Sequence, residues 1–147
     1  MLAISKKTLF ALEAVLDTAC NAGERPVRSG EISARQGIPN RYLEPVMQEL
    51  VRAGILDGVR GPHGGYRLGR NKEQISLAEI DDAVMKTEVR VPISEMRPSS
   101  RLGQEIIQPL FADLVRRWTE QLEDISIEKL ANQARATLAK DAKASGK

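Results

Sequence analysis

The stretch VRGPHGGYRL, residues 59–68, has the composition of a surface that contacts a polyanion. It holds three glycines, one proline and two arginines, and it contains no acidic residue. Glycine lets a backbone approach a neighbouring surface closely, and proline stiffens a loop. Arg60 and Arg67 can supply charge to phosphates or to a narrow minor groove. We interpret His63, at the tip, as a phosphate or groove contact in preference to a metal ligand.

A second group of polar side chains lies at the start of a helix that Ile38-Pro39 opens. Arginine pairs with guanine, asparagine or glutamine with adenine, and glutamate with the amino group of cytosine. Glu44 is the most specific candidate, because an acid facing phosphates costs affinity unless it selects a base; a plain surface glutamate is the alternative. The ring of Tyr42 either packs on the stretch at 59–68, with its hydroxyl on a phosphate, or belongs to the core edge. The candidate DNA-binding residues are Arg28, Ser29, Asn40, Arg41, Tyr42, Glu44, Gln48, Arg60, Pro62, His63 and Gly64.

Catalytic and metal-binding patterns are missing from the sequence. HGGY at 63–66 is similar to the oxyanion-hole glycines of some esterases, but no serine lies in the G-x-S-x-G turn of such enzymes. The glycines of 58–69 lead into a strand, which excludes a dinucleotide-binding fingerprint. Cys20 and His63 are the single cysteine and histidine, too few for a metal site unless two subunits share a cluster. We therefore expect no enzyme and no metal ligand.

Charge is distributed unevenly, although the net charge is only +2. Residues 25–72 hold nine basic and four acidic residues, a net charge of +5, whereas residues 73–138 hold eight basic and twelve acidic residues, a net charge of −4. A localised positive face favours a polyanionic partner, since each neutralised phosphate releases counterions; an uneven solvated surface is the alternative. Charges interrupt every apolar run, so we expect a cytoplasmic protein with no membrane span and no secretory signal.

The first helix is predicted from Ser5, its N-cap, to about residue 22. Its larger apolar residues recur at three and four positions and define the side expected to face the core: Leu9, Leu12, Leu16 and Ala19. Cys20 lies on or near that side, so we interpret it as a small buried hydrophobe; a thiol switch is the alternative.

Two short helices and a hairpin follow. Ser29 is expected to cap a helix that ends at Gly37, and Ile38-Pro39 opens another that stops at Ala53-Gly54. The second helix repeats its apolar residues at the helical period: Leu43, Val46, Met47 and Leu50. Two helices joined through a glycine predict a helix-turn-helix. Residues 55–59 and 66–68 predict the strands of a hairpin, the wing of a winged helix.

The second half of the chain predicts an element for association. SLAE at 76–79 is a capping box, and its helix directs Leu77, Ile80, Val84 and Met85 inward. Residues 87–101 predict an irregular linker. A long helix follows from about Leu102 to Leu122, with Pro109 near its first turns or kinking it. Its apolar band is too broad for its own chain to bury, so a second copy is the expected partner through Leu102, Ile106, Leu110, Leu114, Trp118 and Leu122. Ser126 caps a last helix to about Leu138, and 139–147 form a disordered tail.

Residues 38–70, IPNRYLEPVMQELVRAGILDGVRGPHGGYRLGR, resemble the Rrf2 family of bacterial winged-helix transcriptional regulators. SLAEI at 76–80 and DISIEKL at 124–130 also resemble family segments. The resemblance implies a homodimer joined by the long helix, with recognition helices in successive major grooves of a pseudo-palindromic site and wings in the flanking minor grooves. It implies DNA contacts for Arg41, Tyr42, Glu44, Arg60, His63 and Gly64.

Two features depart from the family pattern. Many members hold an iron–sulfur cluster on three cysteines in the loop that corresponds to 87–101, and this loop has none. Cluster-based sensing is therefore not expected, and the signal is a partner protein, a small molecule, another cue or none. Pro45 implies that the recognition helix begins late or bends.

We therefore expect a mainly α fold with a small β-hairpin: a winged helix-turn-helix DNA-binding domain (1–86), a linker (87–101), dimerisation helices (102–138) and a disordered tail (139–147). The expected function is a sequence-specific DNA-binding transcriptional regulator, a repressor that occludes a promoter. It would bind double-stranded DNA as a homodimer without a cofactor, and respond to an unidentified effector or partner protein. The alternative is a winged-helix interaction module whose basic face meets an acidic protein.

Overall fold

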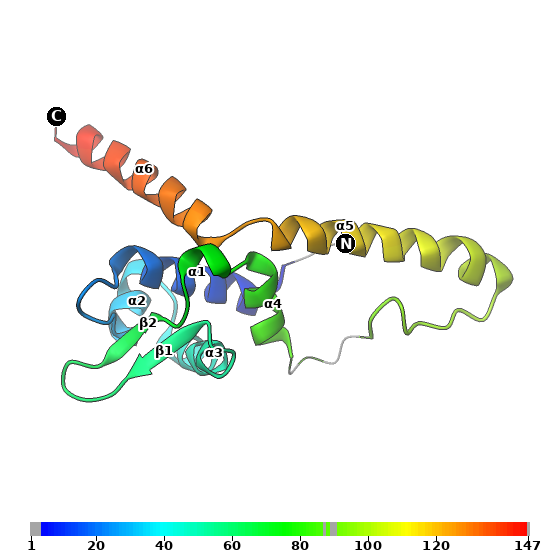
Figure 1. Ribbon diagram of the computed structural model, residues 1–147, viewed down its shortest axis with the longest axis horizontal. Coiled ribbons are helices and arrows are strands. Elements are labelled where there is room, and N and C mark those ends of the chain that lie inside the picture. The colour runs from blue at the N-terminus through cyan, green and yellow to red at the C-terminus, as the bar shows by residue number, and fades with distance from the viewer. Residues whose placement is uncertain (1–3, 87, 89–90, 147) are drawn as a thin grey trace.

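The computed structural model describes residues 4–86, 88 and 91–146, and it shows a helical body with two helices that project from it (Figure 1). The helices are α1 (Lys6–Asn21), α2 (Ser29–Gln36), α3 (Asn40–Arg52), α4 (Leu77–Met85), α5 (Gln108–Glu123) and α6 (Ile127–Ser145). The strands are β1 (Leu56–Val59) and β2 (Gly65–Leu68), and two short turns are the 3-10 helix η1 (Lys72–Gln74) and the π-helical η2 (Gly103–Ile107). This confirms the mainly α fold with a small β-hairpin.

Helix α1 begins as predicted, but its buried side is only in part the predicted one. The Ser5 hydroxyl accepts a hydrogen bond from the Thr8 N–H at 3.0 Å, which confirms the N-cap. The buried residues of α1 are Thr8, Ala11, Ala14, Val15, Asp17 and Thr18. Leu12 and Ala19 pack against the core from its edge, but Leu9 is 47% exposed and Leu16 is only partly buried, so the predicted core side is correct only in part. Alanines on the buried side let α1 pack closely on its neighbours, which leaves the leucines at the edge of the contact.

The helix-turn-helix of α2 and α3 is confirmed. Gly37 has a φ of 67°, the left-handed conformation that ends α2. The N-cap is Arg28 and not Ser29, because Ser29 is the first helical residue and the Glu31 carboxylate accepts the Arg28 N–H at 3.0 Å. The residues predicted to face the core from α3 are buried: Leu43, Val46, Met47 and Leu50. Helix α3 starts at Asn40 with Pro45 inside it, so of the two expectations for Pro45 a late start is wrong, and a bend stays a prediction.

The hairpin is anchored to the body at its second strand. The strands β1 and β2 are antiparallel, with Leu56 opposite Leu68 and Val59 opposite Gly65. Val27, between α1 and α2, exchanges two backbone hydrogen bonds with Tyr66, at 2.9 and 2.7 Å. These bonds fix the hairpin beside α3 in the position of a wing, as Figure 1 shows.

Helix α4 and the start of α6 are joined. Ser76 and Glu79 exchange the two predicted capping-box hydrogen bonds, both at 3.2 Å. The Leu77 N–H donates to the Ile125 carbonyl at 3.0 Å, and the Ile127 N–H donates to the Ile75 carbonyl at 2.8 Å. The side chains of Ile127 and Ala131 are fully buried, so the first turns of α6 complete the core of the body.

Helix α5 follows a connection that is irregular over residues 91–100; residues 87, 89 and 90 of the predicted linker lie outside the described residues. The Gln108 N–H donates to the Gly103 carbonyl, five residues back, in the π-helical turn. Pro109 comes next, and its ring would clash with the Glu105 carbonyl in a regular α-helix, so the wider turn accommodates it. No residue of α5 is buried. The helix projects from the body (Figure 1), and its apolar residues Leu110, Leu114 and Val115 are exposed.

Helix α6 runs to Ser145, past the end predicted at Leu138. Residues 139–145 are therefore helical, and the expected disordered tail is wrong for this part of the chain. Alanine and lysine dominate the segment, and both are strong helix formers that extend a helix already nucleated on the core. Among the described residues, none of the helices combines the length and apolarity that a membrane span needs.

Candidate nucleic-acid interface

Helix α3 presents its predicted reading residues to solvent. The side chains of Leu43, Met47 and Leu50 fix one face of the helix in the core. The candidate residues on the helix are all exposed: Asn40, Arg41, Tyr42, Glu44 and Gln48. Asn40, Glu44 and Gln48 recur every four residues and form one outward row. These amide and carboxylate groups can hydrogen-bond to base edges in a major groove.

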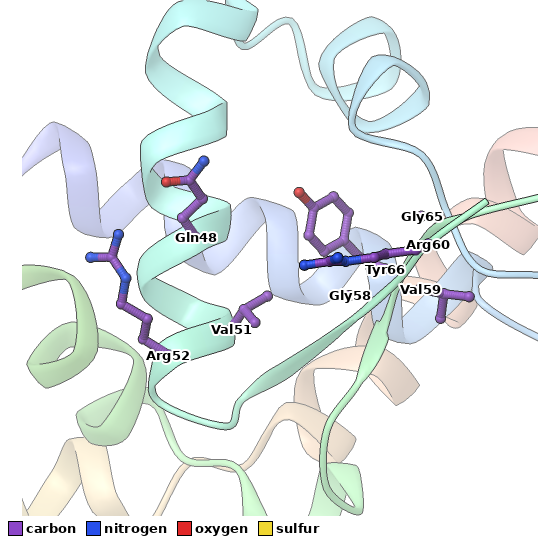
Figure 2. Close-up of a pocket in the computed structure, with 8 residues that line it drawn as sticks. All are labelled: Gln48, Val51, Arg52, Gly58, Val59, Arg60, Gly65 and Tyr66. Atoms are coloured by element: carbon purple, nitrogen blue, oxygen red, sulfur yellow. The ribbon is translucent and has the colours of Figure 1, made fainter. Parts of the chain in front are cut away.

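A hollow of about 500 Å³ separates α3 from the hairpin; we call it the wing hollow. Its lining consists of Gln48, Val51, Arg52, Gly58, Val59, Arg60, Gly65 and Tyr66. In Figure 2, Gln48 and Arg52 come from the helix, while Arg60 and Tyr66 extend from the hairpin toward it. The hollow therefore combines cations from both elements with the aromatic ring of Tyr66. Such a lining suits a sugar–phosphate backbone.

The wing tip is held by an arginine of the α2 cap. The Arg28 guanidinium donates to the Pro62 carbonyl at 2.5 Å, and this hydrogen bond connects the N-cap of α2 to the wing tip. His63 and Gly64 line a polar hollow of about 210 Å³ together with Arg28 and Glu31. The structure thus brings together Arg28, Pro62 and His63, and Ser29 stands beside them as the first residue of α2.

The wing glycines serve the internal packing of the hairpin more than was expected. A Cβ at Gly64 would lie 2.3 Å from the Val59 carbonyl oxygen, and one at Gly65 would lie 2.5 Å from that of Val27. A side chain at either position would therefore force the neighbouring backbone to move. Gly61 has a φ of 106° and open space around it. Of the three glycines at 61, 64 and 65, it is therefore the one whose backbone can come close to a neighbouring surface, as expected.

Two residues take positions that differ from expectation. The ring of Tyr42 stacks on Phe10 of α1, with centroids 6.3 Å apart, so of its two interpretations packing on the wing is wrong, and a place at the core edge agrees with the structure, because Phe10 packs against the core. The Arg67 guanidinium donates to the Glu24 carbonyl and does not line the wing hollow. It lies on the opposite face of β2 from Tyr66, because successive side chains of a strand alternate.

Two other arginines of residues 25–72 form ion pairs with carboxylates of the same chain. The Arg35 guanidinium donates two hydrogen bonds to the Asp17 carboxylate, from Nε at 2.9 Å and from a terminal nitrogen at 2.8 Å. This hydrogen bonding raises the pKa of Arg35 and links α1 to α2. Arg70 pairs with Glu79 at 3.2 Å. The positive charge that lines the hollows at α3 and the wing includes Arg25, Arg28, Arg41, Arg52 and Arg60.

Sequence reasoning missed Arg52, Tyr66 and Phe10. Arg52 lies four residues after Gln48, so the helical period alone could have placed both on one face. Tyr66 could have been placed by strand alternation. No sequence signal points to Phe10 as the partner of Tyr42, because their contact depends on how α1 crosses α3.

The sequence profile of a family described as "Rrf2: Iron-dependent Transcriptional regulator" matches residues 4–133. The chain belongs to the Rrf2 family. It is 35% identical over 130 residues to the HTH-type transcriptional regulator IscR of Pectobacterium atrosepticum, covering 88% of this chain and 79% of that protein. It is 37% identical over 130 residues to IscR of Photorhabdus laumondii, with the same coverage.

Solved structures of Rrf2 proteins share the fold. CymR, described as the global cysteine regulator of B. subtilis, superposes with a TM-score of 0.72 at 26% identity, over 90% of this chain and 98% of that one. IscR of T. potens superposes with a TM-score of 0.71 at 27% identity, over 90% of this chain and 88% of that one. These relatives confirm the predicted class: the chain is a DNA-binding transcriptional regulator of the helix-turn-helix type.

The residues of this Rrf2 protein do not fit an iron–sulfur cluster. Such clusters are held by cysteine thiolates, and residues 87–101 contain neither cysteine nor histidine. Cys20 is the single cysteine, and it lies in a hollow between α1 and α6 beside Leu16 and Leu138. Burial raises the pKa of the Cys20 thiol, which lowers its thiolate fraction and its reactivity. Neither a cluster nor a thiol switch is supported by these residues.

Proposed function

We propose that the protein is a homodimeric repressor that binds a pseudo-palindromic operator. The observation that carries the proposal is the placement of two unlike surfaces. Helix α5 projects with an open apolar stripe, while α3 and the hairpin lie on another side of the body (Figure 1). Two copies joined through α5 would therefore leave both reading surfaces free.

The stripe on α5 has the composition of an isologous interface. Its members are spaced by four residues and stay exposed: Leu102 at 68% and Ile106 at 57% in the helical turns before α5, and Leu110 at 52% and Leu114 at 42% in α5 itself. Trp118 and Leu122 continue the stripe and are partly covered. A twofold axis brings the same stripe from both copies together, and this burial stabilises a dimer by about 25 cal/mol per Å² of apolar surface.

DNA binding by such a dimer follows from the geometry of the body. Each α3 would enter a major groove, and half-sites one helical turn apart require reading helices about 34–36 Å from each other. Asn40, Glu44 and Gln48 would face the bases, while Arg60 and His63 of the wing would meet the flanking minor groove. A dimer seated on a promoter in this way excludes polymerase, and an unidentified effector or partner protein would release it.

Titration of DNA at several salt concentrations tests the proposal. A duplex selected from a random pool by the purified protein should bind with an affinity that falls steeply as salt rises. Arg60→Ala should weaken binding, and Lys140→Ala, the same loss of charge on the exposed end of α6, should not. Sedimentation should show a dimer. A protein that enriches no duplex, or binds an acidic protein in place of DNA, would contradict the proposal.

A further inference from the structure

Helix α3 is flanked by a second hollow, on the side away from the wing. It has a volume of about 420 Å³ and lies between the first turns of α1 and of α3; we call it the α1 hollow. Its lining consists of Lys6, Lys7, Phe10, Arg41, Tyr42, Pro45 and Val46. Three of these residues are basic and none is acidic. The α1 hollow thus has an apolar floor and a positively charged rim.

An aromatic platform orients Arg41 toward this hollow. The guanidinium carbon of Arg41 lies 4.7 Å from the centroid of the Tyr42 ring, a cation–π contact. The Tyr42 ring is itself stacked on Phe10, with an angle of 29° between the two planes. Arg41 is therefore held at the hollow beside α1.

The two lysines of the rim differ in their partners. Lys7 makes an ion pair with Glu49 at 2.9 Å, which ties α1 to α3. Lys6, the first residue of α1, is exposed. Lys6 and Arg41 therefore present their charges to the same opening from two different helices.

A helix about 10–12 Å across fills the major groove, and one sugar–phosphate strand then runs along each of its sides. The wing hollow meets the strand on one side of α3. With α3 in a major groove, the α1 hollow would face the other strand beside the first turns of the helix. Its cations and apolar floor match phosphate oxygens and deoxyribose.

We infer that Arg41 and Lys6 clamp a phosphate of the strand opposite the wing, with Tyr42 as the platform for Arg41. Arg41 is then a backbone contact and not a reader of guanine, and base reading falls to Asn40, Glu44 and Gln48. Lys6 extends the DNA interface onto α1. The inference rests on the proposed function, since it requires α3 to enter a major groove.

Two measurements separate a phosphate clamp from a base reader. The first is the affinity of the full-length protein for a mixed-sequence duplex of about 30 base pairs across a salt series. Arg41→Ala and Lys6→Ala should each weaken binding by about tenfold, and the double variant should reduce the slope of log K against log salt by about 0.9 per half-site, with a smaller reduction in each single variant because both cations share one phosphate. Lys140→Ala on α6 is the matched control and should leave the slope unchanged.

The second measurement is selection from a random pool with wild type and Arg41→Lys. The lysine keeps the charge but loses the bidentate geometry that guanine recognition needs. A phosphate clamp predicts the same consensus for both proteins. A consensus that changes at one base pair per half-site, or a Lys6→Ala protein with wild-type affinity, would overturn the inference. Failure of the wild type to enrich any sequence would instead refute the proposed function.

The role of the Tyr42 ring as a platform for Arg41 is tested separately, by DNA binding of two Tyr42 variants. Tyr42→Phe keeps the ring and should bind DNA as the wild type does, whereas Tyr42→Leu removes the cation–π contact and should reproduce a large part of the Arg41→Ala loss. Equal losses in both variants would show that the hydroxyl matters and not the ring. Thermal unfolding of each variant checks that the body remains folded.

Discussion

The body and helix α5 place their apolar side chains in opposite ways. In α3, Leu43, Met47 and Leu50 are fully buried, whereas in α5, Leu110 is 52% and Leu114 is 42% exposed. Both helices are amphipathic, so the difference lies in what covers the apolar side. The body closes its core with its own chain, and α5 has no equivalent cover. The folding of the body and the association through α5 should therefore be separable by mutation.

The largest effect is expected from charges placed on the α5 stripe. Leu110→Glu with Leu114→Glu should dissociate the proposed dimer, because carboxylates would be buried against apolar partners. Loss of the second reading helix should lower operator affinity at least about 100-fold. Sedimentation velocity and DNA titration measure the two effects.

Position 119 offers a control for that double variant. Thr119 is nine residues from Leu110, so it lies on the opposite side of α5. Thr119→Glu should leave the dimer intact. A dimer that survives the double variant would show that α5 is not the interface.

Truncation within the body should act on stability. Leu50→Ala leaves a cavity in the core and should lower the free energy of unfolding by about 2–5 kcal/mol. The same truncation on the stripe, Leu114→Ala, should weaken association and leave the unfolding of the body unchanged. Thermal unfolding followed by circular dichroism at low and high protein concentration separates these outcomes. Equal losses at low concentration would contradict the independence of the body.

Element boundaries were predictable where residues within one turn determine them, as at the starts of α1 and α4 and the end of α2, whereas the N-cap of α2 and the end of α6 were not. Ser5 and Ser76 cap their helices through side-chain hydrogen bonds within one turn, and Gly37 adopts the left-handed conformation that ends α2. The buried side of α1 was not predictable from leucine spacing, because close packing selects small residues such as Ala11 and Ala14. The pattern of large apolar residues carries no information about how near a neighbouring helix comes.

In the candidate site too, features set by one helix were predictable and features set by contacts between elements were not. The exposed row of α3 follows from the helical period of its buried residues, so the sequence predicts it. The position of Tyr42 depends on Phe10, and that of Arg67 depends on the Glu24 carbonyl. Both partners are distant in sequence, and only the crossing of the elements brings them together.

A methyl group at the wing tip should have a smaller effect than the core truncation. In Gly64→Ala the new Cβ would meet the Val59 carbonyl at 2.3 Å and the Gly61 carbonyl at 2.9 Å, so the tip must rearrange. We expect a loss of about 1–3 kcal/mol in stability and weaker DNA binding. Gly23→Ala is the control, because its Cβ would meet nothing within 4 Å. Unchanged DNA affinity in Gly64→Ala would show that the shape of the tip is irrelevant to binding.

The smallest effect is expected from substitutions in α6, whose first turns pack in the core of the body and whose far half is exposed. Ser126 caps this helix by accepting the Lys129 N–H at 3.2 Å, immediately before the buried Ile127. Ser126→Ala should cost about 1 kcal/mol, and the loss should appear in the unfolding of the whole body because Ile127 packs in its core. Thr137→Ala, on the exposed part of α6, should change stability by less than about 0.5 kcal/mol. Hydrogen exchange should accordingly protect the amides near Ala131 far more than those beyond Thr137, since only the first turns of α6 share the stability of the body. Uniform protection along α6 would instead show that its far half is covered in solution, by the partner copy or by the body.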